Sequence, residues 1–189
     1  MTVSNVGVLI PIKRFDEAKL RLAPALDAAD RAALARTMAE CVLRAAAPLP
    51  VTVVCDDSEV ASWAAAAGVD VLWTAELGLN GAVAKGVAYL RLAGFERVVV
   101  SHADLLFATP GSLSNLPRDG VVLVPDRHED GTNVASVPAH LAFPWSYGPG
   151  SFRRHQQAAM DLGLNPTVVR DEDLGWDVDT PADLVQLPT

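Results

Sequence analysis

Short apolar runs alternate with amphipathic stretches along most of this chain. Runs of strand length, rich in Val, occupy residues 6–12, 51–56, 69–74, 97–104 and 120–126. Between them, apolar residues recur at helical spacing over 28–47, 58–68 and 80–94. Strands that are apolar on both faces are typical of a mostly parallel sheet with helices on both sides. The pattern predicts a three-layer α/β fold in a single domain, residues 1–189.

The pattern loosens after residue 126. Residues 131–139 alternate between polar and apolar, which is typical of an edge or antiparallel strand, and 150–163 have helical spacing. A short helix is expected near 109–116. Ser58 and Asn80 have the residue types of N-caps. The final helix start is predicted at a Thr cap, a Pro at the first helical position and an acid two residues later, namely Thr180, Pro181 and Asp183.

Composition narrows the class of protein. The chain has 189 residues, is 50% hydrophobic and carries a formal net charge of −8. This charge argues against a general nucleic-acid binder, which needs a basic face. No apolar run is long enough to span a membrane and no secretory leader precedes the first strand, so a cytoplasmic location is expected. Cys41 and Cys55 are unclustered, which favours buried thiols over a metal site or disulfide.

Candidate chemistry gathers where the predicted strands end. Ligands of open α/β sheets bind outside the carboxyl ends of the strands. Asp104 and Asp126 follow two of these strands, and Asp177 and Asp179 lie near the end of the chain. Hard oxygen ligands suit Mg²⁺, which also keeps waters and substrate phosphates in its shell. The loop after the first strand supplies cations for phosphate charge: Lys13, Arg14, Lys19 and Arg21.

The pair Asp177 and Asp179 raises a specific question. If the backbone there is extended, the two side chains leave the same face and repel each other. A bound cation would relieve this repulsion. The alternative is a pair of solvated acids in a turn, since Asp is common in turns. His102 precedes Asp104 by two residues and is interpreted as its neighbour rather than as a ligand.

Six segments, spread over nearly the whole chain, resemble the CofC/FbiD family of guanylyltransferases in coenzyme F420 biosynthesis. The segments are "IPIKRFDEAKLRLAP", "GLNGAVAKG", "HADLL", "PDRHEDGTN", "YGPGSFRRH" and "DVDTPADL". The resemblance implies a Rossmann-like nucleotidyltransferase (GT-A-like) fold with a mostly parallel mixed sheet. It also implies transfer of GMP from GTP to 2-phospho-L-lactate or phosphoenolpyruvate. One departure is Leu106, where the family usually has Pro.

The resemblance assigns roles to individual residues. Asp104, Asp177 and Asp179 match Mg²⁺-binding acids, and Asp104, Asp177 and Lys13 are the candidate catalytic residues. The nucleotide would meet Lys13, Lys19, Arg21, Asn80 and Gly81, the last two in a loop. The phospho-acid would meet Thr132, Gly148 and Ser151, where glycines allow close approach and free N–H groups at a helix start favour an anion.

The implied partners are GTP, the phospho-acid and the next transferase of the pathway, which would receive the product. The oligomeric state stays open, a homodimer included. Two other classes remain open at this point. One is a nucleotidyltransferase or sugar transferase with another acceptor or nucleotide. The other is a non-catalytic relative that binds nucleotide or a partner protein, for which Leu106 is the supporting feature.

Overall fold

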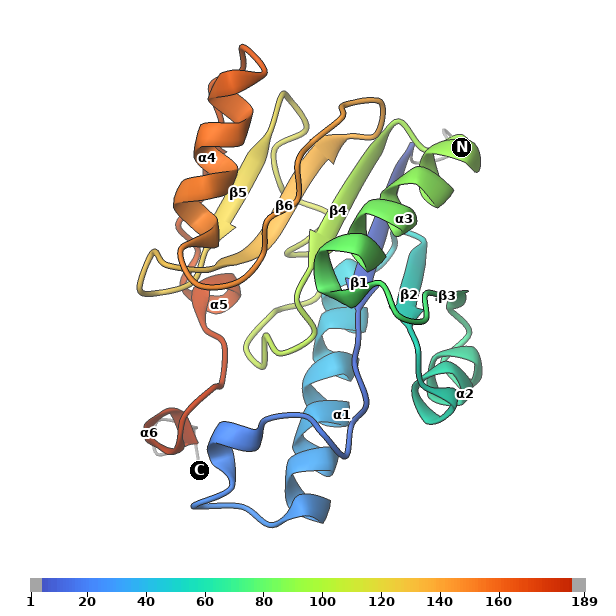
Figure 1. Ribbon diagram of the computed structural model, residues 1–189, viewed down its shortest axis with the longest axis vertical. Coiled ribbons are helices and arrows are strands. Elements are labelled where there is room, and N and C mark those ends of the chain that lie inside the picture. Colours follow the sequence, from blue (N-terminus) through green and yellow to red (C-terminus); the bar gives the residue numbers. More distant parts are fainter. Residues whose placement is uncertain (1–4, 185–189) are drawn as a thin grey trace.

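The computed structural model describes residues 5–184, which form a seven-stranded sheet in the order β3-β2-β1-β4-β6-β5-β7 (Figure 1). Only β6 runs antiparallel to its neighbours, and the other pairs are parallel. The mostly parallel mixed sheet is therefore confirmed. The strands are β1 (Val6–Pro11), β2 (Val51–Cys55), β3 (Asp70–Trp73), β4 (Arg97–Ser101), β5 (Val122–Pro125), β6 (Thr132–Pro138) and β7 (Thr167–Val168).

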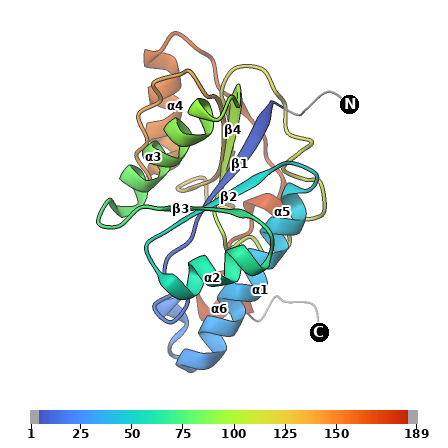
Figure 2. The ribbon, with the colours of Figure 1, turned by 90° about the vertical axis from the view of Figure 1, so that its right-hand side faces the viewer.

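Helices cover both faces of the sheet, giving the predicted three layers (Figure 2). Successive residues of β1 show the division: Val8 and Ile10 belong to the core under α1, whereas Leu9 packs under α3. Helix α4 packs over β5 and β6 on the same face as α3. The helices are α1 (Ala28–Ala46), α2 (Ser58–Ala66), α3 (Gly78–Leu92), α4 (Ser151–Asp161), α5 (Glu172–Gly175) and α6 (Pro181–Leu184).

Helix α3 approaches the sheet closely at one glycine. A Cβ atom added to Gly86 would lie 2.6 Å from both terminal methyl groups of Leu9, which is fully buried in β1. The absence of a side chain therefore sets the distance between α3 and the central strand. This packing holds the first turn of α3 near the carboxyl ends of β1 and β2.

Three local expectations were wrong. Residues 109–116 contain no helix and form turns over 110–115, because Gly111 has a left-handed backbone (φ 84°) that interrupts a helix. Asp57, one residue before Ser58, caps α2 by accepting hydrogen bonds from the N–H groups of Glu59 and Val60. Helix α3 begins at Gly78 and its N-cap position is Leu77, so Asn80 lies inside the first turn.

The sequence pattern over 131–139 indicated an edge strand or an antiparallel strand. Strand β6 is antiparallel, but it is not an edge strand. It lies between β4 and β5, and the edges of the sheet are β3 and β7.

Across residues 5–184, none of the helices is long and apolar enough to cross a membrane. Cys55 is buried, Cys41 is partly exposed, and both are free thiols.

Candidate active site

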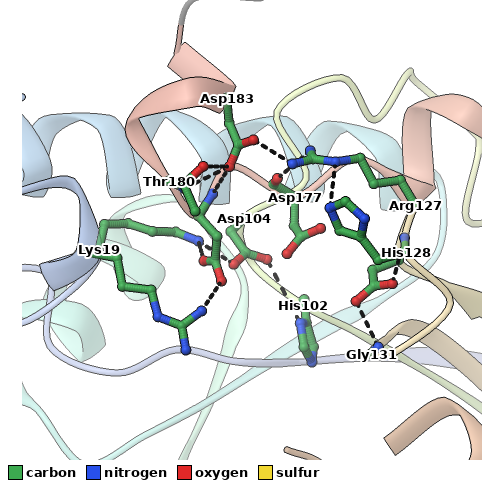
Figure 3. A network of polar contacts seen from close by, with 12 residues as sticks. Lys19, His102, Asp104, Arg127, His128, Gly131, Asp177, Thr180 and Asp183 are labelled. Carbon is green, nitrogen blue, oxygen red and sulfur yellow. Dashed lines mark hydrogen bonds and ion pairs between the residues drawn. The ribbon is translucent and has the colours of Figure 1, made fainter. Parts of the chain in front are cut away.

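The loop after β1 carries a lysine that is held between two carboxylates. Lys19 has a left-handed backbone (φ 53°), which is uncommon outside glycine, at the start of the 3-10 helix Leu20–Leu22. Its ammonium nitrogen lies 2.5 Å from Asp104 Oδ2 and 2.8 Å from Asp179 Oδ1 (Figure 3). Burial lowers the pKa of Lys19, but the two carboxylates outweigh burial and raise it above its ordinary value.

Asp104 follows β4 and is succeeded at once by a tight turn. The N–H of Ala108 donates to the carbonyl of Leu105 over 3.2 Å, which closes the turn. Leu106 occupies the second position of this turn, where proline is favoured but not required. The turn after the predicted metal-binding acid therefore forms with Leu in place of the family's Pro.

Asp104 and Asp177 form a pair of like charges. Oδ1 of Asp104 is buried without a hydrogen-bond partner among residues 5–184, and His102 Nδ1 lies 3.9 Å from it. Burial raises the pKa of Asp177, and the negative charges of Asp104 and then Asp179 raise it further. In Figure 3 the carboxyl group of Asp177 lies beside that of Asp104. The arrangement leaves negative charge on Asp177 uncompensated by a hydrogen-bonded cation within the described residues.

The structure does not bring the three predicted metal ligands together as one cage. Within residues 5–184, no cluster of three or more acidic, His or Cys side chains is arranged to hold a metal ion. Asp179 instead forms ion pairs with Lys19 and with Arg21, whose Nη1 lies 3.2 Å from Asp179 Oδ2. Asp104 and Asp177 alone still fit Mg²⁺, which is commonly bound by one or two carboxylates plus waters and phosphates. The buried, unbonded Oδ1 of Asp104 is the observation that supports this fit.

A partly buried ion pair shapes the segment that carries Asp177 and Asp179. Asp183 accepts hydrogen bonds through Oδ2 from the N–H groups of Asp179 (2.9 Å) and Thr180 (2.6 Å), and forms an ion pair with Arg127. The guanidinium of Arg127 also lies 4.2 Å over the ring of Trp176 and donates to the carbonyl of Asp177. Burial raises the pKa of Asp183, but the hydrogen bonds that it accepts outweigh burial and lower it. The predicted acid near the helix start thus fixes the backbone of the site.

The three residues predicted to bind the phospho-acid lie together at the start of α4. Ser151 Oγ accepts a hydrogen bond from the N–H of Thr132 over 3.0 Å, and Gly148 (φ 117°) precedes Ser151 in the same loop. Thr132 and Ser151 are 0% and 2% exposed, whereas Gly148 is open to solvent. The N–H groups of Gly150, Ser151 and Phe152 at this helix start are not free, because they already donate to Asp130 or Gly148.

Sequence reasoning missed His155, the hub of this cluster. His155 is 0% exposed. Its Nε2 accepts a hydrogen bond from the N–H of Ser146 at a distance of 3.0 Å, so the proton of the neutral ring is on Nδ1. Nδ1 donates to Thr132 Oγ1, also at 3.0 Å. Burial, and then the positive charges of Arg154 and His102, lower the pKa of His155 to about 4. The signal available in the sequence was its position four residues after Ser151, which places both side chains on one face of α4.

Asn80 joins the two sides of the site. Its Oδ1 accepts from the N–H of Tyr147 over 2.6 Å, and its Nδ2 donates to the carbonyl of Tyr147 over 3.4 Å. Gly81 lies within α3, so the expectation that both residues form a nucleotide-side loop was wrong. Asn80 thus ties the first turn of α3 to the loop that contains Gly148.

Two adjoining cavities lie outside the carboxyl ends of the central strands. The larger, about 200 Å³, is lined by Lys13, Lys19, His102 and Asp104 together with apolar side chains. The smaller, about 70 Å³, shares Lys13 with it and extends over the ends of β2 and β3. The structure therefore brings Lys13, Lys19 and Asp104 to one cavity, whereas Thr132, Gly148 and Ser151 line neither of these two.

Solved structures of similar fold come from enzymes that handle nucleotides. A protein from Desulfovibrio desulfuricans, proposed to be a nucleotide-diphospho-sugar transferase, superimposes with a TM-score of 0.76 at 16% identity, covering 96% of this chain and 85% of that one. A 4-diphosphocytidyl-2C-methyl-D-erythritol synthase superimposes with a TM-score of 0.62 at 17% identity, covering 95% and 94%. At such identities the likeness shows the fold alone. The fold is thus that of the Rossmann-like nucleotidyltransferases.

The sequence comparisons give the family. The model of the guanylyl transferase CofC-like family matches residues 6–188. A phosphoenolpyruvate guanylyltransferase of Sphaerobacter thermophilus is 34% identical over 95% of this chain and 90% of its own length. A 2-phospho-L-lactate guanylyltransferase of Halorubrum lacusprofundi is 36% identical over 95% and 82%. The chain belongs to the CofC-like guanylyl transferase family.

Proposed function

We propose that this protein transfers GMP from GTP to a small phosphorylated carboxylic acid, phosphoenolpyruvate or 2-phospho-L-lactate, with release of pyrophosphate, as a step of coenzyme F420 biosynthesis. Family membership supports the reaction class, and relatives named for each of the two acceptors match this chain. The observation that carries the proposal is the facing pair of Asp104 and Asp177 beside the ammonium of Lys19, at the edge of a cavity.

In the proposed reaction, an oxygen of the acceptor's phosphate attacks the α-phosphorus of GTP. The new bond joins that oxygen to the α-phosphorus, and the bond to the β-phosphate oxygen breaks, so pyrophosphate leaves with the electron pair. The acceptor phosphate is ionised near neutral pH, and no protein nucleophile or general base is required. The work of the chain is therefore to position two anions and to stabilise the charge that develops between them.

Each charged side chain has a part in that work. Asp104 and Asp177 would hold Mg²⁺, which when bound neutralises charge on the α-phosphate and the departing pyrophosphate. Lys13 is exposed at the cavity mouth and without an ion-pair partner among the described residues, so it is free to meet phosphate oxygens. Lys19 and Arg21 each form an ion pair with Asp179, and in this proposal both cations would meet the phosphates of the nucleotide. Asp179 acts here through these cations rather than as a metal ligand.

The acceptor would be held by Thr132, Gly148 and Ser151. Thr132 Oγ1 already accepts a bond from His155 and Ser151 Oγ accepts one from the N–H of Thr132, so each hydroxyl keeps its own proton to donate to an anion. Because both side chains are covered, the acceptor reaches them only when the groups that cover them move. The exposed Gly148 offers the first contact with the main chain.

A single assay tests the proposal. Pyrophosphate release is measured with each of the four nucleoside triphosphates, with and without Mg²⁺, against phosphoenolpyruvate and 2-phospho-L-lactate. The expected result is release that needs GTP, Mg²⁺ and at least one of the two acids. Release with another nucleotide would make the protein a related nucleotidyltransferase. No release with any pair, from a protein that still binds GTP, would make it a non-catalytic relative.

A further inference from the structure

The smaller cavity is suited to the base of the nucleotide. It lies outside the carboxyl ends of β2 and β3, on the side of β1 away from Asp104 and the acceptor residues. It adjoins the larger cavity through four shared residues at the end of β1, in the loop after it and at the start of α3: Pro11, Ile12, Lys13 and Leu79. With the phosphates of a nucleotide at Lys13 and Lys19, the nucleoside extends over the end of β1 into this space.

One carboxylate in that cavity is uncommitted. Asp56 directly follows β2, is exposed, lines the cavity, and forms no hydrogen bond or ion pair through its side chain with any residue in 5–184. Its neighbour Asp57 is already used, since its Oδ1 accepts the N–H groups of Glu59 and Val60 at 3.0 Å each and caps α2. Two adjacent acids of equal charge therefore have different roles, one structural and one open.

The chemistry of guanine fits an open carboxylate. On its Watson–Crick edge guanine presents two adjacent donors, N1–H and the 2-amino group, and a carboxylate accepts both through its two oxygens. Adenine and cytosine present a ring-nitrogen lone pair at the matching place, which a carboxylate repels, and uracil presents one donor. We infer that Asp56 selects guanine by accepting hydrogen bonds from N1–H and the 2-amino group. This inference rests on the proposed function and names the base-selecting residue of the same site.

Xanthine provides a test that a merely structural role would not pass. Xanthine keeps N1–H but carries a carbonyl in place of the 2-amino group. An Asn side chain offers one acceptor and one donor, which match N1–H and that carbonyl. Asp56→Asn should therefore weaken GTP binding and strengthen xanthosine triphosphate binding. Asp57→Asn is the matched control, because it removes the same charge one residue away and Asn still caps a helix.

The experiment is calorimetric titration of the parent, Asp56→Asn and Asp57→Asn with GTP, inosine, xanthosine and adenosine triphosphates in Mg²⁺, without acceptor. The parent should bind GTP roughly tenfold or more tightly than inosine triphosphate (ITP), which lacks the 2-amino group. Its preference for GTP over ATP should be larger still. Asp56→Asn should prefer xanthosine triphosphate to GTP, while Asp57→Asn keeps the parent order. An Asp56→Asn protein that retains the parent preference overturns the inference, as does a loss of GTP with no gain of xanthosine triphosphate.

Failure of this inference and failure of the proposed function give different results. A parent that transfers GMP, with an Asp56→Asn variant that still prefers GTP, overturns only the choice of Asp56. A parent that shows the swap in preference but transfers GMP to neither acid upholds Asp56 and overturns the reaction. A parent that binds none of the four nucleotides overturns both.

Discussion

The two sides of the candidate site differ in charge and in burial. The side proposed to bind the nucleotide carries charges, with Lys19 between Asp104 and Asp179 and the pKa of Asp177 raised by burial and by its acidic neighbours. The side proposed to bind the acceptor is neutral and buried, with Thr132, Ser151 and His155 joined by hydrogen bonds. The charged side is left with repulsion that a cationic ligand relieves, whereas the neutral side is already satisfied and must open. Substitutions on the two sides should therefore differ in how far their effects depend on ligand.

The largest effect is expected at Asp177, through activity rather than stability. Asp177→Asn should lower Mg²⁺-dependent transfer roughly 10²- to 10³-fold. It should leave the metal-free protein as stable as the parent or slightly more so, because one of several close negative charges is removed. Steady-state kinetics and thermal melts with and without Mg²⁺ and GTP measure both. Asp173→Asn, an exposed acid in α5, is the control. Normal activity and a normal ligand shift for Asp177→Asn would make Asp177 a solvated acid.

His155 should produce the next largest effect, and it should depend on pH. Burial in the folded protein lowers the pKa of His155 to about 4, below the ordinary value of about 6.5. The unfolded chain therefore binds the proton more tightly, so stability falls as pH decreases from about 6.5 toward 4, by on the order of 3 kcal/mol. Urea unfolding at several pH values measures this loss. His155→Asn should show a shallower decrease than the parent, whereas the exposed His140→Asn should follow the parent curve.

Ser151 sharpens the comparison because its role on the neutral side does not need a ligand. Ser151→Ala leaves the buried N–H of Thr132 without its acceptor, which should destabilise the free protein by about 1 to 3 kcal/mol. It should also raise the KM for the phospho-acid while the affinity for GTP stays nearly constant. Chemical denaturation and separate titrations of the two substrates test both. A fall in GTP affinity with no change in the KM for the phospho-acid would assign Ser151 to the nucleotide side of the site.

The smallest effect is expected at the exposed Lys13. Lys13→Ala should weaken the binding of GTP about fivefold and leave the binding of GMP nearly unchanged. The reason is that a solvated cation at the outer phosphates contributes about 1 kcal/mol to binding. Arg14→Ala is the control, since Arg14 is committed to Asp16 at 2.8 Å on the surface. Competition binding with the two nucleotides decides the point. Equal weakening of GTP and GMP would move Lys13 away from the phosphates.

The hydrophobic pattern predicted the architecture because burial leaves a record in the sequence. One buried face gives apolar residues at a regular period, and two buried faces give a continuous apolar run. The strands from β1 to β5 and the helices α1 to α4 lie where periodicity put them. Short elements leave too few residues for a period, so α5 was not foreseen and the helix near 109–116 was expected in error. There a single left-handed glycine, Gly111, decided the structure.

The composition of the site was predictable but its pairing was not. The acids and cations at the strand ends were identified from residue type and position. Lys19 pairs with both Asp104 and Asp179, and this pairing depends on the path of the backbone. Because Asp179 is engaged by Lys19 and Arg21, Asp104 and Asp177, rather than three acids, are the candidate metal ligands. Asn80 shows the same limit, because a residue suited to a helix cap was used to hold Tyr147 in a distant loop.

The pairing of Lys19 with Asp179 has a consequence for how the protein is made. These residues are 160 positions apart, so the ion pair joins the start of the chain to nearly its last described turn. During synthesis the residues of β1 to β4 are made early, but Lys19 has no Asp179 to contact until residue 179 has emerged. Closing a loop of this length costs entropy, so the ion pair is favoured only when packing of the intervening chain brings its two residues together. The contact that orders the acids at this edge of the sheet therefore cannot form until residue 179 has been made.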